Sequence, residues 1–227
     1  MSACHFASRP MDWAALRIPS DWTFAAAQSS QYRGRILRSY MGQSMTSDQL
    51  DLAALARGMP ALTKAMGRVH AESAAVCLSK HRHRQGINLK VDSPLPESPA
   101  AFRLHWPKVT PQMRRTYNDL HDATEQGAVG IAILLIRSLT KFVVIERAMK
   151  RTGIDYWLGD ASSKRSGLPF QNKARLEVSG ILQDAEGRFS SRMAAKNTQT
   201  MRSDSTGIPA YVVVVEFSTP KAGLSVR

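Results

Sequence analysis

Apolar residues recur with a helical period between residues 46 and 70, and the Thr-Ser pair at the start could cap a helix there. The pattern then changes to alternation, which predicts strands at 73–79 and 87–92 around the basic turn KHRHRQG. AFRLHWP predicts a further strand after the proline-rich loop DSPLPESPA. The N-terminal region, residues 1–110, is therefore predicted to be helical at first and then to form a β-hairpin.

The second part of the chain, residues 111–227, has a sharper pattern. A Thr-Pro pair starts a long apolar helix, and AYVVVVEF at 210–217 is so apolar that we expect this last strand at the centre of a sheet. Between them we expect strands at 141–149, 154–158 and 174–182 and a helix at 189–203. The order α-β-β-β-α-β predicts an α/β (α+β) fold with helices flanking a mixed sheet.

The charge of the chain points to a polyanionic partner. The net charge is +13, with 31 Lys and Arg against 18 Asp and Glu. Both parts of the chain carry the excess, and a surface this positive favours nucleic acid, although a basic protein without such a ligand is the alternative. His81 and His83 lie in a basic turn that would repel a metal, so we expect an exposed loop there. The candidate nucleic-acid contacts are Arg82, Arg84, Lys164, Arg165 and Arg192.

The cysteine count and the apolar runs bear on the compartment. Two cysteines, Cys4 and Cys77, do not form a disulfide framework and suggest a reducing environment. No signal peptide is recognisable, because charged residues interrupt the N-terminal segment. The longest apolar run, 128–136, is far below the roughly 20 residues that span a bilayer. We therefore expect a cytoplasmic protein that does not enter a membrane.

Two acidic residues lie where strands would favour apolar side chains. If the strands at 154–158 and 174–182 pair, Asp155 and Glu177 can converge at one edge, since side chains alternate between faces. Two close carboxylates repel, and a hard cation such as Mg²⁺ or Mn²⁺ relieves that repulsion. Such a cation can activate water for in-line attack on phosphorus. The alternatives are that Asp155 caps a turn and that Glu177 is an edge-strand charge.

The element order, with GID entering the second strand and LEVSG on the third, resembles the PD-(D/E)XK nuclease superfamily, also called restriction-endonuclease-like. The resemblance covers roughly residues 115–220. It implies that Asp155 is the motif aspartate and Glu177 the acid of the (D/E)xK motif. It also implies that Glu125, on the first core helix, helps to hold the metal, although an acid near a helix start can instead serve the helix dipole.

The chain departs from the family pattern at the motif lysine, because Ser179 stands where that lysine belongs. On the following helix, Arg192, Lys196 and Gln199 form one stripe. Some members of the superfamily supply the lysine from this helix. Lys196 is therefore expected to orient the attacking water and stabilise the developing charge, and Gln199 to orient water or contact phosphate. A solvated helix face is the alternative. Glu216 could support the site or lie where its strand ends.

The resemblance implies a Mg²⁺-dependent nuclease that hydrolyses phosphodiester bonds in DNA. The alternative is a catalytically inactive nuclease-fold subunit that binds nucleic acid or serves as a scaffold in a larger assembly. Residues 1–110 could contact nucleic acid, a protein partner or a second copy of the chain.

Overall fold

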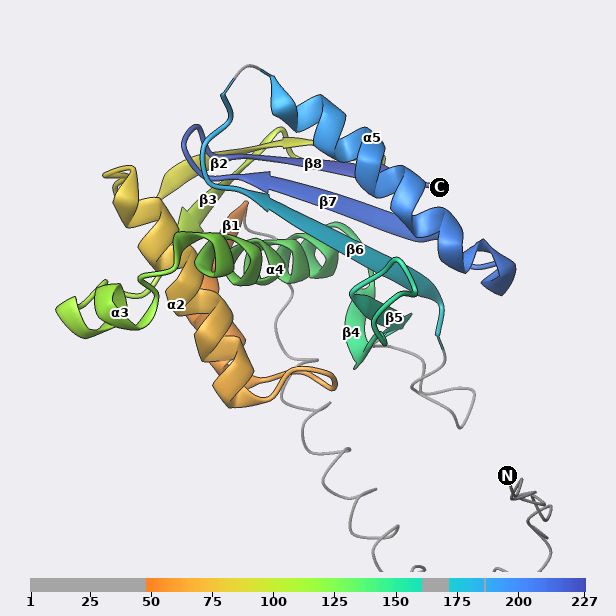
Figure 1. Cartoon of the computed structure of the whole chain (residues 1–227), viewed down its shortest axis with the longest axis horizontal. Coiled ribbons are helices and arrows are strands. Elements are labelled where there is room, and N and C mark those ends of the chain that lie inside the picture. Colours follow the sequence, from red (N-terminus) through yellow and green to blue (C-terminus); the bar gives the residue numbers. More distant parts are fainter. Residues whose placement is uncertain (1–47, 161–171, 186) are drawn as a thin grey trace, which may run out of the picture. The chain divides into compact units, whose positions relative to one another are not determined.

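The computed structural model describes residues 48–160, 172–185 and 187–227. Its centre is one mixed eight-stranded sheet with the order β1-β3-β2-β8-β7-β6-β5-β4 (Figure 1). The elements in chain order are β1 (Gln49–Asp51), the 3₁₀ helix η2 (Leu52–Arg57), α2 (Lys64–Lys80), β2 (Ile87–Asp92), β3 (Ala101–His105), α3 (Pro111–Thr116), α4 (Leu120–Leu139), β4 (Phe142–Arg147), β5 (Tyr156–Asp160), β6 (Ala174–Ile181), α5 (Arg188–Thr200), the 3₁₀ helix η3 (Met201–Thr206), β7 (Ala210–Glu216) and β8 (Lys221–Val226).

Helices cover the middle of the sheet on both faces. α4 packs on β6 and β7, and α2 lies against α4 on that side (Figure 1). α5 packs on the same two strands. It covers the opposite face, because neighbouring residues of β6 alternate: a Cβ on Gly180 would meet the Thr124 carbonyl of α4 at 2.5 Å, whereas Ser179 receives a hydrogen bond from Arg192 of α5. β6 is therefore enclosed between two helices.

The predicted helix at 46–70 is confirmed only in part, at η2 and at the start of α2, and the predicted strand at 73–79 is wrong. The chain forms β1 and η2, and α2 begins at Lys64 after Thr63, whose side chain accepts a hydrogen bond from the backbone N–H of Met66. The run AESAAVCLS resembles a strand by alternation but is the buried part of α2. Its small side chains let α2 approach α4, where a Cβ on Gly127 would lie 2.8 Å from backbone atoms of Ala74. Tertiary packing decides the helix here.

The predicted strand at 87–92 is confirmed as β2, and AFRLHWP contains β3. The hairpin is formed by these two antiparallel strands, so DSPLPESPA is its connection and the KHRHRQG turn is not. The sheet continues across residue 110, because β2 also pairs with β8. The division into a contact region at 1–110 and a nuclease core at 111–227 assigns a function to each part of the chain, so it stays a prediction.

The second part follows the predicted order α-β-β-β-α-β through α4, β4, β5, β6, α5 and β7. β7 is buried along its whole length and lies inside the sheet, as its composition predicts. It is not the last strand: β8 follows, pairs antiparallel with β7 and joins it to β2. The long helix begins as the separate short helix α3, capped by Thr110. None of the described helices is long and apolar enough to cross a membrane.

Candidate functional site

The site forms where β5 leaves β6. The two strands pair only from Leu158 opposite Ala174 to Tyr156 opposite Leu176. Beyond Leu176, this edge of β6 has no strand partner in the described parts of the chain, and Asp155 takes the place of one. The Asp155 backbone N–H donates to the Leu176 carbonyl, and its carboxylate Oδ2 accepts the Val178 N–H at 2.8 Å. Asp155 thus satisfies the open edge of a buried strand.

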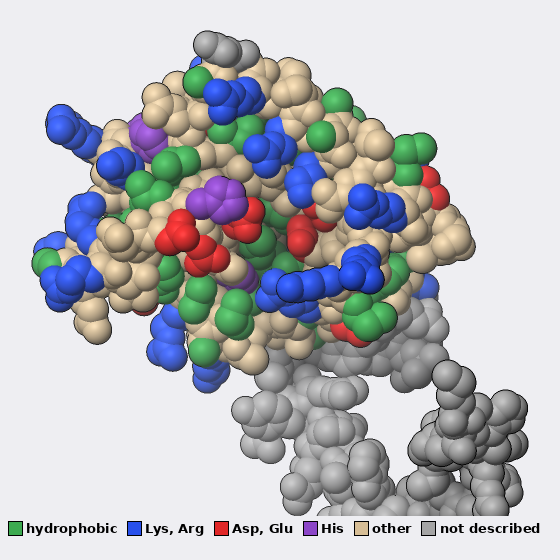
Figure 2. All heavy atoms as spheres, in the orientation of Figure 1, with side chains coloured by type: hydrophobic (Ala, Val, Ile, Leu, Met, Phe, Trp, Pro, Cys, Tyr) green, Lys and Arg blue, Asp and Glu red, His purple; other side chains and the backbone are tan. Residues whose placement is uncertain are grey.

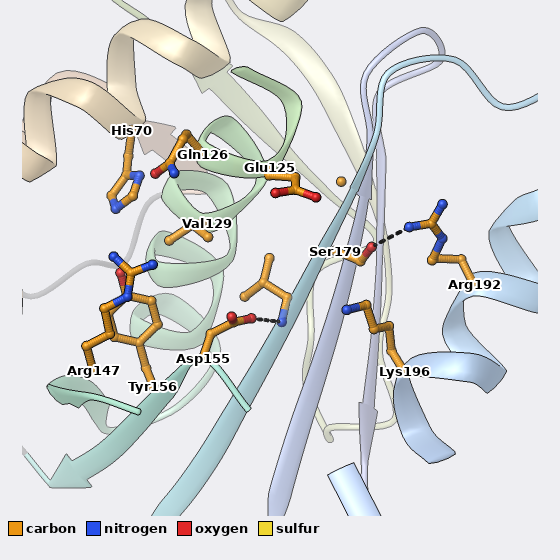
Figure 3. Close-up of a pocket in the computed structure, with 12 residues that line it drawn as sticks. His70, Glu125, Gln126, Val129, Arg147, Asp155, Tyr156, Ser179, Arg192 and Lys196 are labelled. Atoms are coloured by element: carbon orange, nitrogen blue, oxygen red, sulfur yellow. Dashed lines mark hydrogen bonds between the residues drawn. The ribbon is translucent and has the colours of Figure 1, made fainter. Parts of the chain in front are cut away.

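A pocket of about 170 Å³ lies at this open edge (Figure 3). α4 contributes side chains from one face of the sheet and α5 from the other, so the pocket exists because β5 stops short between them. It is lined by His70, Glu125, Gln126, Val129, Arg147, Asp155, Tyr156, Val178, Ser179, Gly180, Arg192 and Lys196.

Glu177 lies beside the pocket and is held from α5. Its side chain is 2 % exposed, and its Oε1 accepts two hydrogen bonds, from Lys196 Nζ at 2.6 Å and from Gln199 Nε2 at 2.8 Å. Lys196 Nζ also donates to Gln199 Oε1 at 3.1 Å. The three predicted catalytic side chains on β6 and α5 therefore form one hydrogen-bonded triangle, which a solvated helix face would not do.

Asp155 and Glu177 perturb each other. Burial raises the pKa of Asp155, although the Val178 N–H and the positive charge of Lys196 oppose the rise. Burial and the neighbouring Asp155 carboxylate raise the pKa of Glu177 to about 7, against the opposing effect of Lys196. Two neighbouring buried carboxylates with raised pKa values, one of them lining a pocket, are typical of a functional site.

Ser179 stands at the position of the motif lysine. Ser179 lies on β6 with its hydroxyl 3.3 Å from the Arg192 guanidinium, and it brings no charge to Glu177. Lys196 approaches the same carboxylate from α5 instead. Gly153 allows this helix to come close, since a Cβ there would lie 2.2 Å from the Gln199 carbonyl. The glycine of GID thus sets the distance between α5 and the strand that Asp155 precedes.

The residues present fit a divalent cation in two respects. Glu177 Oε2 is buried and accepts no hydrogen bond, so one oxygen of the acid remains available. Asp155 and Glu177 together supply the two carboxylates that suffice for Mg²⁺ when water and phosphate oxygens complete its shell. Within the described residues, no group of three acidic, His or Cys side chains is arranged to hold a metal.

Glu125 lies at the exposed side of the pocket, on α4. Its side chain is 65 % exposed and its Oε1 lies 3.9 Å from His121 Nε2, one turn earlier on the helix. Figure 3 shows its carboxylate pointing toward β6. Glu125 therefore shares the pocket with Asp155 but is not part of the buried triangle, and its metal role stays a prediction.

The predicted nucleic-acid contacts are separated. Arg192 lines the pocket, whereas exposed Arg82 and Arg84 lie in the turn after α2. That turn is fastened to the sheet by His81 Nε2 at 2.8 Å from the Leu182 carbonyl and by His83 Nε2 at 2.9 Å from the Phe217 carbonyl. The remaining two, Lys164 and Arg165, lie outside the described residues.

Glu216 does not support the pocket. It is fully buried and binds the turn between β7 and β8: Oε1 accepts the Ser218 N–H at 2.7 Å and its hydroxyl, and Oε2 accepts the Thr219 N–H at 2.8 Å and its hydroxyl at 2.7 Å. Burial alone would raise the pKa of Glu216, but these hydrogen bonds lower it. Glu216 is the last residue of β7, so the alternative that it lies where its strand ends is confirmed.

Sequence reasoning missed one end of the pocket, formed by His70 on α2, Gln126 on α4 and Arg147 at the end of β4. The sequence pattern places His70 at the end of a helix and Arg147 in a strand, and it indicates no role for either residue. No periodicity distinguishes these residues from an ordinary core histidine and a surface arginine. Only the topology, which places α2 and β4 on either side of α4, brings them together.

The charges around the pocket differ in sign by position. On the face shown in Figure 2, acidic side chains gather near the centre and Lys and Arg side chains surround them. A polyanion would be attracted to such a rim, whereas the acidic centre would repel it unless a cation were bound.

Comparisons with models of protein families, with curated proteins and with solved structures found no match for this chain.

Proposed function

We propose that the protein is a metal-dependent nuclease that hydrolyses phosphodiester bonds in DNA. The observation that carries the proposal is the 2.6 Å contact between Lys196 Nζ and Glu177 Oε1 beside Asp155. Acid, acid and lysine are the groups of the PD-(D/E)XK pattern, and here the lysine comes from α5. The net charge of +13 supports a polyanionic substrate.

Each residue has a defined part in the proposed reaction. Asp155 and Glu177 would hold Mg²⁺ or Mn²⁺, which when bound supplies Lewis-acid activation of a phosphoryl oxygen and of water. Lys196 would orient the attacking water and stabilise negative charge on the phosphoryl oxygens. Gln199 holds the lysine and the glutamate in register through its two hydrogen bonds, and Arg192 would contact the phosphate at the rim.

The test is degradation of plasmid and linear DNA with Mg²⁺ or Mn²⁺. Asp155→Ala and Glu177→Ala should abolish cleavage, and Lys196→Ala should reduce kcat by about 10²- to 10³-fold, the usual cost of one group that stabilises transition-state charge. Arg188→Ala is the matched control, because it removes a positive charge from the exposed start of the same helix. Full activity of the Glu177 variant would refute the site, even if the wild type cleaves DNA.

A second candidate is a nucleic-acid-binding subunit that does not cleave. It is favoured by the exposed position of Glu125 and by the absence of a three-ligand metal cluster among the described residues. In that case Lys196 would serve only to neutralise a buried glutamate. Salt-dependent DNA binding without cleavage of DNA or RNA in either metal would select this candidate.

A further inference from the structure

The end of α2 and helix α3 form a surface rich in Lys and Arg. Residues 73–91 and 98–118 contain no Asp or Glu, although both segments contain several basic residues. Figure 2 shows Lys and Arg side chains gathered over this part of the molecule, at the left of the view. The exposed cations at the end of α2, in the turn after it and around α3, which we call the basic surface, are Lys80, Arg82, Arg84, Lys108, Arg114 and Arg115. None of these six forms an ion pair with a described carboxylate.

Hydrogen bonds between the two segments hold the basic surface together. Arg114 Nη2 of α3 donates to the Ser79 hydroxyl at 2.7 Å, beside the last residue of α2. Gln85 donates from Nε2 to the Trp106 carbonyl at 2.8 Å, and its Oε1 accepts the Trp106 N–H at 3.0 Å. These contacts place the turn after α2 beside the segment that leads to Lys108. The fold therefore joins cations that are distant in the sequence.

The turn after α2 alternates exposed cations with side chains that fasten it. Arg82 and Arg84 are exposed, whereas His81 and His83 each place Nε2 at hydrogen-bonding distance from a backbone carbonyl of the sheet region. The two histidines thus fix the turn from which the arginines extend. A turn that is ordered before a ligand arrives loses little conformational entropy on binding.

Arg82 occupies a position that usually belongs to glycine. Its φ is +58°, and it ends α2 in a Schellman motif, in which its N–H donates to the Ser79 carbonyl at 3.0 Å and the His83 N–H donates to the Leu78 carbonyl at 3.2 Å. Glycine adopts this left-handed conformation without steric strain, whereas a side chain makes it less favourable. A strained arginine at an exposed position is expected where its side chain has a function.

The basic surface adjoins the candidate site along β6. Ser179 and Gly180 line the pocket, and Leu182, whose carbonyl binds His81, is three residues after Ser179. At about 3.3 Å for each residue of a strand, the fastened turn lies roughly 10 Å from the lining of the pocket. Phosphates of one strand of a DNA duplex follow each other at about 3.4 Å along the helix axis. A duplex with a phosphate at the acids therefore reaches the basic surface within a few nucleotides.

The chemistry of the basic surface fits the backbone of a duplex. Arginine donates two parallel hydrogen bonds to phosphate. Proteins that hold single strands also stack bases on accessible aromatic side chains. Of the Phe, Trp and Tyr residues in the two segments, Phe102 and Trp106 are buried, and Tyr117 is half-buried and donates to Glu72 Oε2 at 3.0 Å. The surface thus offers charge and donors without a platform for bases.

We propose that the basic surface binds the sugar-phosphate backbone of duplex DNA beside the scissile phosphate; its role next to the pocket rests on the proposed nuclease function. Arg82 and Arg84, on the turn fixed at the end of β6, contact phosphates a few nucleotides from the pocket. Arg114 and Arg115 extend the contact over α3. Because phosphates carry no sequence information, binding through this surface is independent of base sequence.

The test measures binding of the full chain to a labelled DNA duplex in EDTA, by fluorescence anisotropy at several salt concentrations. The double variants Arg82→Ala/Arg84→Ala and Arg114→Ala/Arg115→Ala should each weaken binding by tenfold or more at low salt. They should also reduce the slope of log K against log salt by about 0.9 for each lost phosphate contact. The control Lys64→Ala/Arg68→Ala removes the same charge from exposed positions at the other end of α2 and should have a much smaller effect.

Three results would overturn the basic surface as a duplex site. The first is an equal loss of affinity in the control pair, which would indicate an effect of net charge alone. The second is binding of single-stranded DNA as tightly as the duplex. The third is competition by poly-glutamate as effective as that by unlabelled duplex at the same concentration of charge.

Arg82→Gly separates the side chain from the backbone strain. The variant should raise the melting temperature by a few degrees, because glycine relieves the strain, and should weaken duplex binding several-fold. Arg84→Gly, at a position without a positive φ, should weaken binding to a similar extent but lower the melting temperature. Wild-type affinity of Arg82→Gly overturns the role of the arginine, and a lowered melting temperature of this variant overturns the strain argument.

The two proposals fail in different ways. Duplex binding that depends on the two arginine pairs, without cleavage in any metal, supports the basic surface and refutes the nuclease. Cleavage with a wild-type KM in both arginine double variants overturns the basic surface and leaves the nuclease intact. If both proposals hold, these variants raise KM several-fold while kcat stays near that of the wild type, because the acids and Lys196 are unchanged.

Discussion

The buried carboxylate of Glu177 should make the metal-free protein less stable as the pH rises. Its pKa is raised from 4.5 to about 7, first by burial and then by Asp155, so the folded state binds this proton more tightly than the unfolded state does. Stability associated with the proton is therefore complete below about pH 4.5 and is lost as the pH rises toward 7. At about 1.4 kcal/mol for each pH unit, the loss is about 3 kcal/mol.

Glu177→Gln removes the charge and keeps the shape of the side chain. The variant should match the wild type near the acidic end of this range and be more stable by about 3 kcal/mol at about pH 8, because the pKa of about 7 already includes the opposing effect of Lys196. The same variant should be inactive in DNA cleavage. A more stable, inactive variant is expected where a site holds like charges together for function.

Urea unfolding followed by circular dichroism, with EDTA and at several pH values between about 5 and 8, measures the effect. Glu146→Gln on β4 is the matched control, because that glutamate is exposed and its change should leave the pH profile as it is in the wild type. The reasoning is refuted if Glu177→Gln is less stable than the wild type at the alkaline end, or if the difference between them does not vary with pH.

Two further predictions concern the frame around the site. Gly153→Ala should cost about 3 kcal/mol in unfolding free energy and reduce cleavage by displacing α5, because φ is +77° and the new Cβ would meet the Gln199 carbonyl at 2.2 Å. The control Gly207→Ala, with φ of +65° and open space around the new Cβ, should cost only about 1 kcal/mol. Equal losses of stability for the two variants in thermal melts would contradict the close approach of α5 to Gly153. Glu216→Ala should cost about 3 kcal/mol by leaving the donors of the β7–β8 turn unpaired, without changing the cleavage rate per folded molecule. Since the pKa of Glu216 is lowered in the folded state, its contribution to folding stability is present above the pKa of the unfolded state and is lost as the pH falls. If the wild type keeps the same stability advantage over Glu216→Ala in acid, the proposed role of the Glu216 carboxylate is refuted.

The sequence predicted the second part of the fold better than the first, for a physical reason. The strands β6 and β7 are continuous apolar runs, and α4 has a long apolar face, so local pattern and tertiary burial agree. In α2 the small residues around Ala74 alternate as in a strand, and only their packing against Gly127 makes them helical. β8 contains Gly223, which packs beneath Phe189 of α5, and its short pattern is not recognisable without that neighbour.

Only some residues of the candidate site were predictable from the sequence. Lys196 and Gln199 were predictable, because helical spacing places them on one stripe and because the family resemblance implies a lysine on this helix. In the structure both side chains donate a hydrogen bond to Glu177 Oε1. Arg147 and His70 were not predictable, since their proximity depends on how α2, α4 and β4 pack in three dimensions. The reason for an acid at position 155 was not predictable either, because it depends on the strand register. That register leaves the Val178 N–H without a strand partner, and the Asp155 carboxylate accepts it.

The position of β8 in the sheet has a consequence for how the chain folds. β8 pairs with neighbouring β7 and also with β2, for which Lys90 lies opposite Lys221, 221 − 90 = 131 residues away. The entropy lost in closing a loop of that length has a length-dependent part of about 4 kcal/mol, which the pairing must offset before it stabilises the sheet. The β7–β8 hairpin can form early, whereas the union of β2 with β8 belongs to a late and slow step. Mutations along the seam between β2 and β8 should therefore change the unfolding rate more than the refolding rate.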